Sequence, residues 1–214
     1  MKAFRMIIAL AALAVLSVTP VQASVNNANY YNFVTDGEIR PYAPADYAAT
    51  PEIPLIPRAD AGWDIVRYYF PRYSTAVVRD ILTGRSFEVK RTFGGQHADV
   101  EPLTEADTEI MYEIWGGWSW DRRAVVVYVG QYVFAGSLAG MPHAGVDSAP
   151  VLAVVNNLSG GFGRGQNLDM VKGNGMDGHV CLHFAGSRIH GSNAINAAHQ
   201  TRVREAAAYI LANY

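Results

Sequence analysis

Short runs of apolar or alternating apolar and polar residues predict a fold built mainly from strands. They begin after about Gly62 and occur at residues 75–81, 86–92, 124–129, 132–136, 151–155 and 180–184. The stretch at 82–85 separates the first two of these runs, and the stretch at 130–131 separates the third and fourth. Both stretches contain glycine and are typical of tight turns. The pattern therefore predicts two β-hairpins and two further strands.

Helical spacing of apolar residues predicts two helices. Thr104 and Asp107 form a variant of the capping box that opens the first helix, and Gly116 ends it after about residue 115. The second helix covers about residues 195–211, where apolar residues recur at Ile195, Ala198, Val203, Ala206 and Ile210. These elements predict an α+β fold with a mostly antiparallel β-sheet or barrel core and two flanking helices.

The N-terminal part of the chain is predicted to be separate from this domain. A short basic region, the apolar run Met6–Val18 and the small-residue signature Val21-Gln22-Ala23 predict a secretory signal peptide at residues 1–23. Residues 24–60 contain five prolines and are predicted to form a Pro/Tyr-rich linker or a strap across the domain. Residues 61–214 are predicted to be a single catalytic-like α+β domain.

Composition and charge narrow the function classes. The 17 Lys and Arg residues against 19 Asp and Glu residues give a net charge of −2, so there is no basic excess to favour nucleic acid. The apolar run near the N-terminus is shorter than the roughly 20 residues of a membrane span, which predicts no stable membrane insertion after signal cleavage. We therefore expect a secreted protein of the cell envelope or the extracellular space. The single cysteine excludes an intramolecular disulfide framework.

The residues that carry chemistry concentrate near the C-terminus, in Gly178-His179-Val180-Cys181-Leu182-His183-Phe184. Side chains two apart on a strand share a face, so His179, Cys181 and His183 are expected to project together. Imidazoles beside a thiol stabilise its thiolate and accept its proton. The motif therefore predicts a cysteine nucleophile at Cys181, with His179 and His183 as further catalytic candidates.

Two other interpretations of these residues stay open. Histidine and cysteine are also zinc ligands, and a zinc-dependent cell-wall peptidase would use His97, Asp99, His179 and His183. The His-x-Cys-x-His spacing is not one of the common zinc-ligand spacings, and no motif requires a metal or another cofactor. In the third interpretation Cys181 is a core residue, the histidines are hydrogen-bonded core residues, and the protein is a non-catalytic cell-wall-binding module.

Gly178-His179-Val180-Cys181 resembles the Ser/Thr-His-Gly-Cys signature of the L,D-transpeptidases of the YkuD type, which cross-link the cell wall. The resemblance implies that Cys181 is the acyl-accepting nucleophile and that His179 is the histidine of the motif. It also implies that His143, which lies between Gly140 and Gly145, is a further histidine of the same site. A β-rich, exported catalytic domain with a free thiol follows from the same resemblance.

The chain departs from the family's pattern at several positions. Gly178 replaces the hydroxyl residue of the signature and Val180 replaces its glycine. His183 stands two residues after the cysteine, where the family usually has Arg or Asn. His143 lies 36 residues before His179, a longer separation than in most members.

Together these observations predict an exported, cysteine-dependent L,D-transpeptidase or carboxypeptidase-like enzyme whose partners are peptidoglycan stem peptides. Cys181 would form a thioester with the stem peptide, and His179 or His143 would act as the general base. The glycine-rich stretch at 159–165 is predicted to form a loop or lid over the site. Transpeptidation and hydrolysis are both compatible with this sequence.

Five residues outside the motif are candidates for substrate binding: His97, Asp99, Trp118, Trp120 and Arg188. His97 and Asp99 either take part in the site, by orienting an imidazole or by contacting the substrate's amine, or lie in a plain turn followed by a helix entry. Trp118 and Trp120 follow two glycines and predict either a stacking platform for sugar or aromatic core packing. Arg188 follows the His-Cys motif closely enough to reach the same site.

Overall fold

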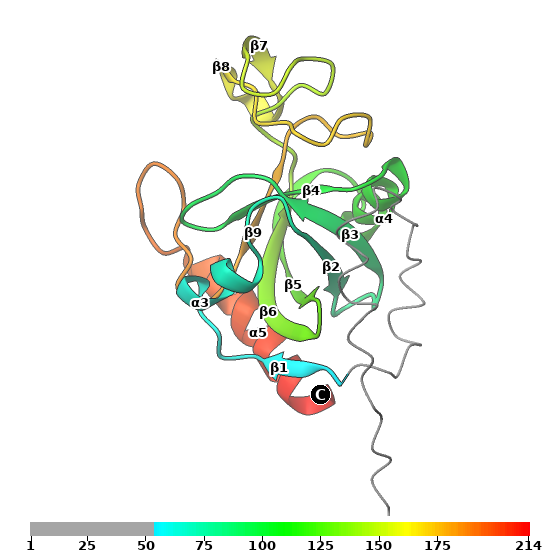
Figure 1. Ribbon diagram of the computed structural model, residues 1–214, viewed down its shortest axis with the longest axis vertical. Helices are drawn as coiled ribbons and strands as arrows, with labels where there is room; N and C mark the ends of the chain where they lie inside the picture. Colours follow the sequence, from blue (N-terminus) through cyan, green and yellow to red (C-terminus); the bar gives the residue numbers. More distant parts are fainter. Residues whose placement is uncertain (1–53) are drawn as a thin grey trace, which may run out of the picture. The chain divides into compact units, whose positions relative to one another are not determined.

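The structure is a computed structural model and describes residues 54–214 (Figure 1). The predicted signal peptide and most of the predicted linker lie outside the described residues. The strands are β1 Ile56–Arg58, β2 Thr75–Asp80, β3 Ser86–Arg91, β4 Ala98–Pro102, β5 Ser119–Val129, β6 Tyr132–Gly140, β7 Val154–Leu158, β8 Gly163–Gln166 and β9 Val180–His183. The helices are α3 Trp63–Tyr69, α4 Glu105–Trp115 and α5 Ala197–Asn213, and a 3₁₀ helix, η1, covers Ser159–Gly161.

Six strands close into an antiparallel barrel in the order β6-β5-β2-β3-β4-β9, with β9 pairing back onto β6. This confirms the predicted α+β class with a mostly antiparallel core. β1, which falls within the predicted linker or strap, pairs in parallel with the first residues of β6, whereas β9 pairs with residues 137–138 further along. Among the described residues there are three α-helices rather than two, because Trp63–Tyr69 forms the unpredicted α3.

The main hydrophobic core fills the barrel. Alternate residues of the barrel strands point inward and are fully buried, in agreement with the period of two that predicts the strands. They include Val78, Phe87, Val89, Val100, Val125, Val127, Phe134, Leu138, Val180 and Leu182. Burial of these side chains is the main contribution to stability, and it leaves the outward-facing residues of β4 and β9 free for other roles.

Helix α5 covers the outer surface of β5 and β6 and forms a second core there. Its buried residues in this core are Val203, Ala206 and Ile210. The prediction that Ile195 and Ala198 lie on the same buried face is wrong. Ile195 precedes the helix and is 51% exposed, and Ala198 is also exposed. The physical reason is the N-cap at Asn196, whose side chain accepts hydrogen bonds from the backbone N–H groups of Ala198 and His199 and so starts the helix at Ala197.

The two predicted hairpins are confirmed as β2–β3 and β5–β6, and the helix predicted after Thr104 is confirmed as α4, including its capping box. The strand predicted at 151–155 is displaced, because β7 begins at Val154. Leu152 has a φ angle of 63°, a left-handed conformation that a regular strand does not contain. β7 pairs with β8 to form a small hairpin, yellow at the top of Figure 1.

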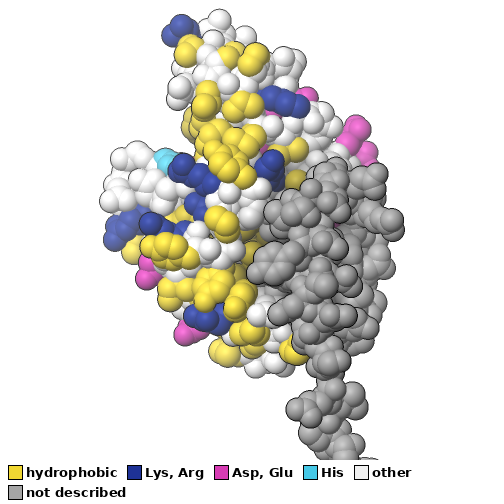
Figure 2. Space-filling model, viewed as in Figure 1, with side chains coloured by type: hydrophobic (Ala, Val, Ile, Leu, Met, Phe, Trp, Pro, Cys, Tyr) yellow, Lys and Arg dark blue, Asp and Glu magenta, His cyan; other side chains and the backbone are white. Residues whose placement is uncertain are grey.

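Apolar side chains gather on one face near and below the β7–β8 hairpin (Figure 2). The exposed apolar residues of this region include Leu152, Val154 and Phe162. No helix of residues 54–214 combines the length and apolar character needed to cross a membrane. Phe162 is of further interest because it also borders the cavity described below.

A buried ion pair ties the end of β2 to β5. Asp80 is 1% exposed, and its carboxylate oxygens accept hydrogen bonds from Arg123 at 2.8 and 2.9 Å. The backbone N–H of Thr83 donates to the same carboxylate. Burial alone would raise the pKa of Asp80, but the hydrogen bonds from Arg123 and Thr83 lower it below its ordinary value.

Replacing Asp80 with Asn is expected to lower the free energy of unfolding by about 2–4 kcal/mol at pH 7, because it leaves Arg123 without its charge partner. Since the pKa of Asp80 is lower in the folded protein than its ordinary value of 3.8, this contribution is present above that value and is lost as the pH falls. Chemical denaturation at pH 7 and pH 3 measures the effect. Equal losses at the two pH values would contradict the assignment.

Candidate active site

Strand β9 carries the His-x-Cys-x-His motif on the outer surface of the barrel wall. Val180 and Leu182 lie in the barrel core. His179, Cys181 and His183 therefore share the opposite face, where all three line a cavity of about 590 Å³. The strand is thus buried on one side among apolar residues and lined on the other by chemically active ones.

Tertiary structure gathers the remaining histidines around the same cavity. In the β4–β9 register Asp99 stands directly opposite Cys181, so the two side chains lie on one face of the sheet. The cavity is lined by Asp99, Cys181 and every histidine of the chain: His97, His143, His179, His183, His190 and His199. These side chains come from two strands, from the loops that flank them and from α5.

A backbone bridge holds His143 beside His179. The N–H group of each residue donates to the carbonyl of the other, at N···O distances of 2.9 and 3.1 Å. Gly178 has a φ angle of +86°, and a Cβ atom at this position would lie 2.2 Å from the His143 carbonyl oxygen. The close approach of the two chain segments therefore requires glycine at this position.

Replacing Gly178 with Ala is expected to separate the segment that carries His143 from β9. The free energy of unfolding should fall by about 2 kcal/mol or more, and activity should fall with it. Gly173 provides a matched control, because its φ angle is +71° but no atom lies within 4 Å of its Cβ position. Thermal unfolding of both variants measures the difference, and equal melting temperatures would contradict the role given to Gly178.

Two imidazole nitrogens face the Cys181 sulfur. Nε2 of His97 lies 3.1 Å from Sγ, and Nε2 of His143 lies 3.4 Å from it. Nδ1 of His97 lies 2.7 Å from the carbonyl oxygen of Arg188, and Nδ1 of His143 lies 2.9 Å from that of Met141. A carbonyl oxygen only accepts hydrogen bonds, so in each neutral ring Nδ1 carries the proton and Nε2 presents its lone pair to the thiol.

Asp99 lies next to the nitrogen of His97 that faces the sulfur. Its Oδ1 atom is 3.2 Å from Nε2 of His97 and 3.2 Å from Nε2 of His190, and its Oδ2 atom is 3.8 Å from Nε2 of His179. Burial alone would raise the pKa of Asp99, but the hydrogen bond from His190 and the other imidazoles beside the carboxylate lower it well below its usual range. Asp99 therefore stays ionised and stabilises a positive charge on His97.

The resting form of Cys181 is a neutral thiol. Burial raises its pKa well above the ordinary value, and the negative charge of Asp99 adds to this shift. Arg122 acts in the opposite direction and favours the thiolate. A thiolate at Cys181 would therefore form by transfer of its proton to a neighbouring base rather than by ionisation into solvent.

Most of the surrounding histidines are neutral near pH 7. Burial lowers the pKa of three of them to about 4, 2 and 3, in the order His179, His183 and His199. Burial also lowers the pKa of His143. The half-exposed His190 differs, because its hydrogen bond to Asp99 raises its pKa. Neutral imidazoles are proton acceptors, and they are also the form that binds metals.

His183 supports the ring of His97 from its face. The rings of His97 and His183 stack with centroids 4.2 Å apart. The ring of His199 stacks on that of His183, with centroids 3.8 Å apart. Nδ1 of His199 is fixed by the hydroxyl of Ser137 at 2.8 Å. The structure therefore places His183, a catalytic candidate from the sequence, where it positions His97.

Several of these side chains are spaced closely enough to hold a metal ion. Three groups have potential ligand atoms within 4.8 Å of one another, namely His97-Cys181-His183, His143-His179-Cys181 and His97-Asp99-His190. The zinc set expected from the sequence, with His97, Asp99, His179 and His183, is divided among these groups instead of forming one of them.

Buried polar side chains fix the long connection between β6 and β9 that carries His143. Asn167 is fully buried and bonds both the N–H and the carbonyl of Val146. Asp169 accepts a hydrogen bond from the N–H of Gly178, and Glu101 of β4 accepts hydrogen bonds from two further N–H groups of this connection. Sequence analysis did not find these residues, because single polar residues, two of them in a loop and one on β4, produce no periodic signal.

One of the two predicted stacking tryptophans borders the cavity. The ring of Trp120 lies 5.1 Å from that of His143, and the ring of Phe162 lies at the same distance. Trp120 is 42% and Phe162 54% exposed, so both offer ring surface to a ligand. Trp118 instead packs edge-on against Tyr112 and is not among the residues that line the cavity. Phe162 belongs to the predicted glycine-rich loop or lid.

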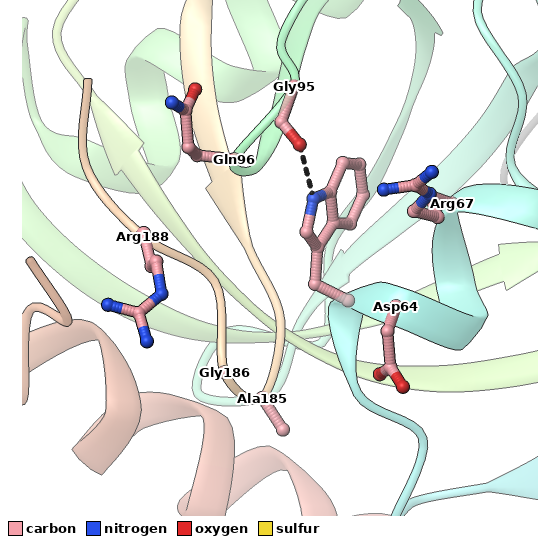
Figure 3. A pocket seen from close by; sticks show the side chains of 8 residues that line it. Asp64, Arg67, Gly95, Gln96, Ala185, Gly186 and Arg188 are labelled. Atoms are coloured by element: carbon pink, nitrogen blue, oxygen red, sulfur yellow. Dashed lines mark hydrogen bonds between the residues drawn. The ribbon is translucent and has the colours of Figure 1, made fainter. Parts of the chain in front are cut away.

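Arg188 contributes to the site through its backbone. Its carbonyl binds His97, whereas its guanidinium donates to the carbonyl of Asn193 at 2.8 Å. The Arg188 side chain borders a second pocket of about 340 Å³, together with Trp63 and Arg67 (Figure 3). The structure therefore places the side chain of this predicted substrate-binding residue in a neighbouring pocket.

Two arginines that the sequence analysis did not select, Arg72 and Arg122, line the main cavity. The register of β5 shifts between Ser119 and Arg122, so the period of two does not predict that Trp120 and Arg122 border the same cavity. Nε of Arg122 is buried and has no hydrogen-bond partner among the described residues. The cavity thus contains a cation whose hydrogen-bonding capacity is not used up by the protein.

The comparisons with known proteins leave function to be argued from this geometry. Neither the models of protein families, nor the curated protein sequences, nor the solved structures contain a significant match to the chain.

Proposed function

We propose that the protein is a cysteine-dependent acyl-transfer enzyme of the L,D-transpeptidase or carboxypeptidase type. The observation that carries the proposal is the position of the Cys181 sulfur, 3.1 Å from Nε2 of His97 in the wall of a cavity. A thiol within hydrogen-bond distance of an oriented base is the arrangement that nucleophilic catalysis requires. The resemblance of the motif around Cys181 adds the reaction type.

His97 is the base in the proposed reaction. Its Nε2 takes the thiol proton while Sγ forms a bond to the carbonyl carbon of an amide, and the resulting imidazolium faces the ionised Asp99. The C–N bond then breaks, and the leaving amine takes the proton from His97. The product is a thioester on Cys181. Attack by water gives a carboxypeptidase, and attack by a second amine gives a transpeptidase.

This assignment differs from the sequence-based expectation for the base, which was His179 or His143. His143 also faces the sulfur, but it lies farther away, at 3.4 Å, and its imidazole forms no ion pair with a carboxylate of the described residues. Nε2 of His179 lies 3.8 Å from Oδ2 of Asp99. His97 alone among the three is within 3.2 Å of both the sulfur and the carboxylate.

The remaining lining of the cavity supports a peptide substrate with a free carboxylate. Arg122 lies near enough to Cys181 to favour its thiolate, so it would also stabilise negative charge on the substrate. Arg72 provides a second guanidinium in the same cavity. Trp120 and Phe162 offer exposed rings, which suit the face of a sugar. Peptidoglycan stem peptides, attached to sugars and ending in carboxylates, combine these features.

A zinc-dependent cell-wall peptidase is the second candidate, because His97, Asp99 and His190 form a group that could hold a metal ion without the thiol as a ligand. The two candidates predict opposite results. The zinc enzyme loses activity on treatment with a chelator and retains it after alkylation of the thiol. The cysteine enzyme retains activity with the chelator and loses it on alkylation.

Mass spectrometry of muropeptides tests the proposed function. The purified protein and the Cys181→Ala variant are incubated with peptidoglycan, and the stem peptides are compared. Trimmed or newly cross-linked stems made by the wild type alone are the expected result, and the new bond identifies the reaction. An unchanged profile with both proteins would contradict the proposal.

A further inference from the structure

Cys181, His143 and His179 stand at the separation that one zinc ion requires. Their potential ligand atoms lie within 4.8 Å of one another, and Nε2 of His143 is 3.4 Å from Sγ. With Zn–N distances of about 2.1 Å and Zn–S distances of about 2.3 Å, tetrahedral ligands lie about 3.6 Å apart. The His143–Cys181 distance is close to this value without any movement of the chain.

The orientation of the rings separates this group from the other group that contains Cys181. The rings of His143 and His179 are inclined at 57°, whereas those of His97 and His183 are stacked with an angle of 18°. A nitrogen lone pair lies in the plane of its ring. Lone pairs of inclined rings can therefore meet at one point, while those of stacked rings run side by side.

The group is also rigid and incompletely hydrogen-bonded. The backbone bridge between His143 and His179 fixes the two rings relative to each other, and Met141 orients the first of them through Nδ1. His179 is 2% exposed, lines the cavity, and its Nδ1 atom has no hydrogen-bond partner among the described residues. A bound ion or a water molecule would satisfy such an atom. Nδ1 of His183 is also buried and without a partner among the described residues, so the inclination of the rings is what distinguishes the two groups.

We propose that Cys181, His143 and His179 bind one Zn²⁺ ion, and that this ion inhibits the enzyme. The ligand set of two imidazoles and one thiolate suits zinc, and all three residues line the cavity. On binding, the Cys181 sulfur forms a bond to zinc and its proton passes to solvent. Asp99, next to His179, compensates the positive charge of the site.

The inhibitory effect rests on the proposed function, whereas the metal site does not. A zinc-bound sulfur is a weaker nucleophile because the metal draws on its electron pairs, and zinc also occupies His143, one of the two histidines that face the sulfur. The same residues therefore cannot serve the metal and the thioester at one time. Zinc would act as a reversible block of the thiol, removed by a chelator.

Cobalt provides the direct test, because a thiolate bound to Co²⁺ gives a charge-transfer absorption band that reports the sulfur ligand. The full-length protein is freed of metal with a chelator and titrated with CoCl₂, and Zn²⁺ is then added in competition. One equivalent of Co²⁺ should produce the band, and Zn²⁺ should abolish it. The band should be absent in Cys181→Ser, which is nearly isosteric.

Histidine variants identify the other ligands. His143→Asn and His179→Asn should each weaken cobalt binding at least ~10-fold, while His183→Ala should leave the band and the affinity unchanged. Circular dichroism of each variant confirms that it is folded. The absence of a band in the wild type, a band that survives in Cys181→Ser, or a larger effect of His183→Ala than of His143→Asn would overturn the assignment.

Activity measurements keep this inference apart from the proposed function. If the chelator-treated protein is active and Co²⁺ does not bind, the zinc site is wrong and the thiol enzyme stands. If Co²⁺ binds as described but the protein is inactive without metal and active with zinc, the site stands and the proposed function is wrong. Activity in the chelated protein with loss on adding one equivalent of zinc supports both.

Discussion

Replacing Cys181 with Ala is expected to abolish turnover of peptidoglycan stem peptides, with a loss of at least ~10³-fold. The thiol sulfur is the only atom in the site that forms the covalent bond to substrate in the proposed reaction. The fold should tolerate the change, because Cys181 lies on the cavity side of β9 and the residues on either side of it fill the barrel core. Muropeptide analysis and thermal unfolding measure the two effects.

Turnover and thermal stability together decide whether Cys181 is the nucleophile or a core residue. We expect a melting temperature within a few degrees of the wild type, together with loss of activity. Cys181→Ser provides a second inactive variant with almost the same side-chain volume. A Cys181→Ala protein that is strongly destabilised but still active would show that the residue is part of the core and is not the nucleophile.

Replacing His97 with Asn is expected to lower the turnover number by about 10²–10⁴-fold. The Asn side chain places an N–H group near the position of Nδ1, so it can keep the hydrogen bond to the Arg188 carbonyl while it removes Nε2. The variant therefore removes the base and retains the local structure. Turnover of stem peptides and the rate of thiol alkylation by iodoacetamide should both fall.

His143→Asn is the matched control for His97. The substituted side chain can likewise keep the bond to the Met141 carbonyl and remove the second nitrogen that faces the sulfur. Because His97 and Asp99 remain in place in this variant, we expect a smaller loss than in His97→Asn. A larger loss in His143→Asn would reverse the roles given to the two histidines.

The fold class and the central motif were predictable from local patterns. The period of two in β9 is strong, because Val180 and Leu182 alternate with His179, Cys181 and His183, and this alternation places the three chemically active side chains on one face. The capping box of α4 and the turns of the two hairpins are also signals within a few residues of one another. Such signals do not depend on the rest of the chain.

The position of Asp99 and the role of His97 were not predictable in the same way. Asp99 faces Cys181 because β4 pairs with β9, which is about 80 residues away in the sequence, and the sequence contains no local signal for that pairing. The tautomer of His97 is set by the carbonyl of Arg188, again through a contact between distant segments. Sequence analysis therefore predicted Cys181 as the nucleophile and left the base among several histidines.

Helix α3 and strand β7 show why local signals fail elsewhere. The N-cap of α3 is Gly62, which makes no side-chain capping bond, and the helix has seven residues, too few for a clear apolar period. β7 was expected three residues too early, since the apolar run that includes Leu152 does not reveal the positive φ angle of that residue. In both places tertiary contacts decide the conformation.

The central claim, that Cys181 forms a thioester with a peptide substrate, is tested most directly by mass spectrometry of the protein itself. The purified protein is mixed with a muropeptide that carries a tetrapeptide stem, quenched in acid and digested. We predict an adduct with the mass of the acyl group on the peptide that contains Cys181, lost on treatment with hydroxylamine. Turnover of the muropeptide without any adduct on Cys181, and at an unchanged rate in Cys181→Ala, would contradict the account.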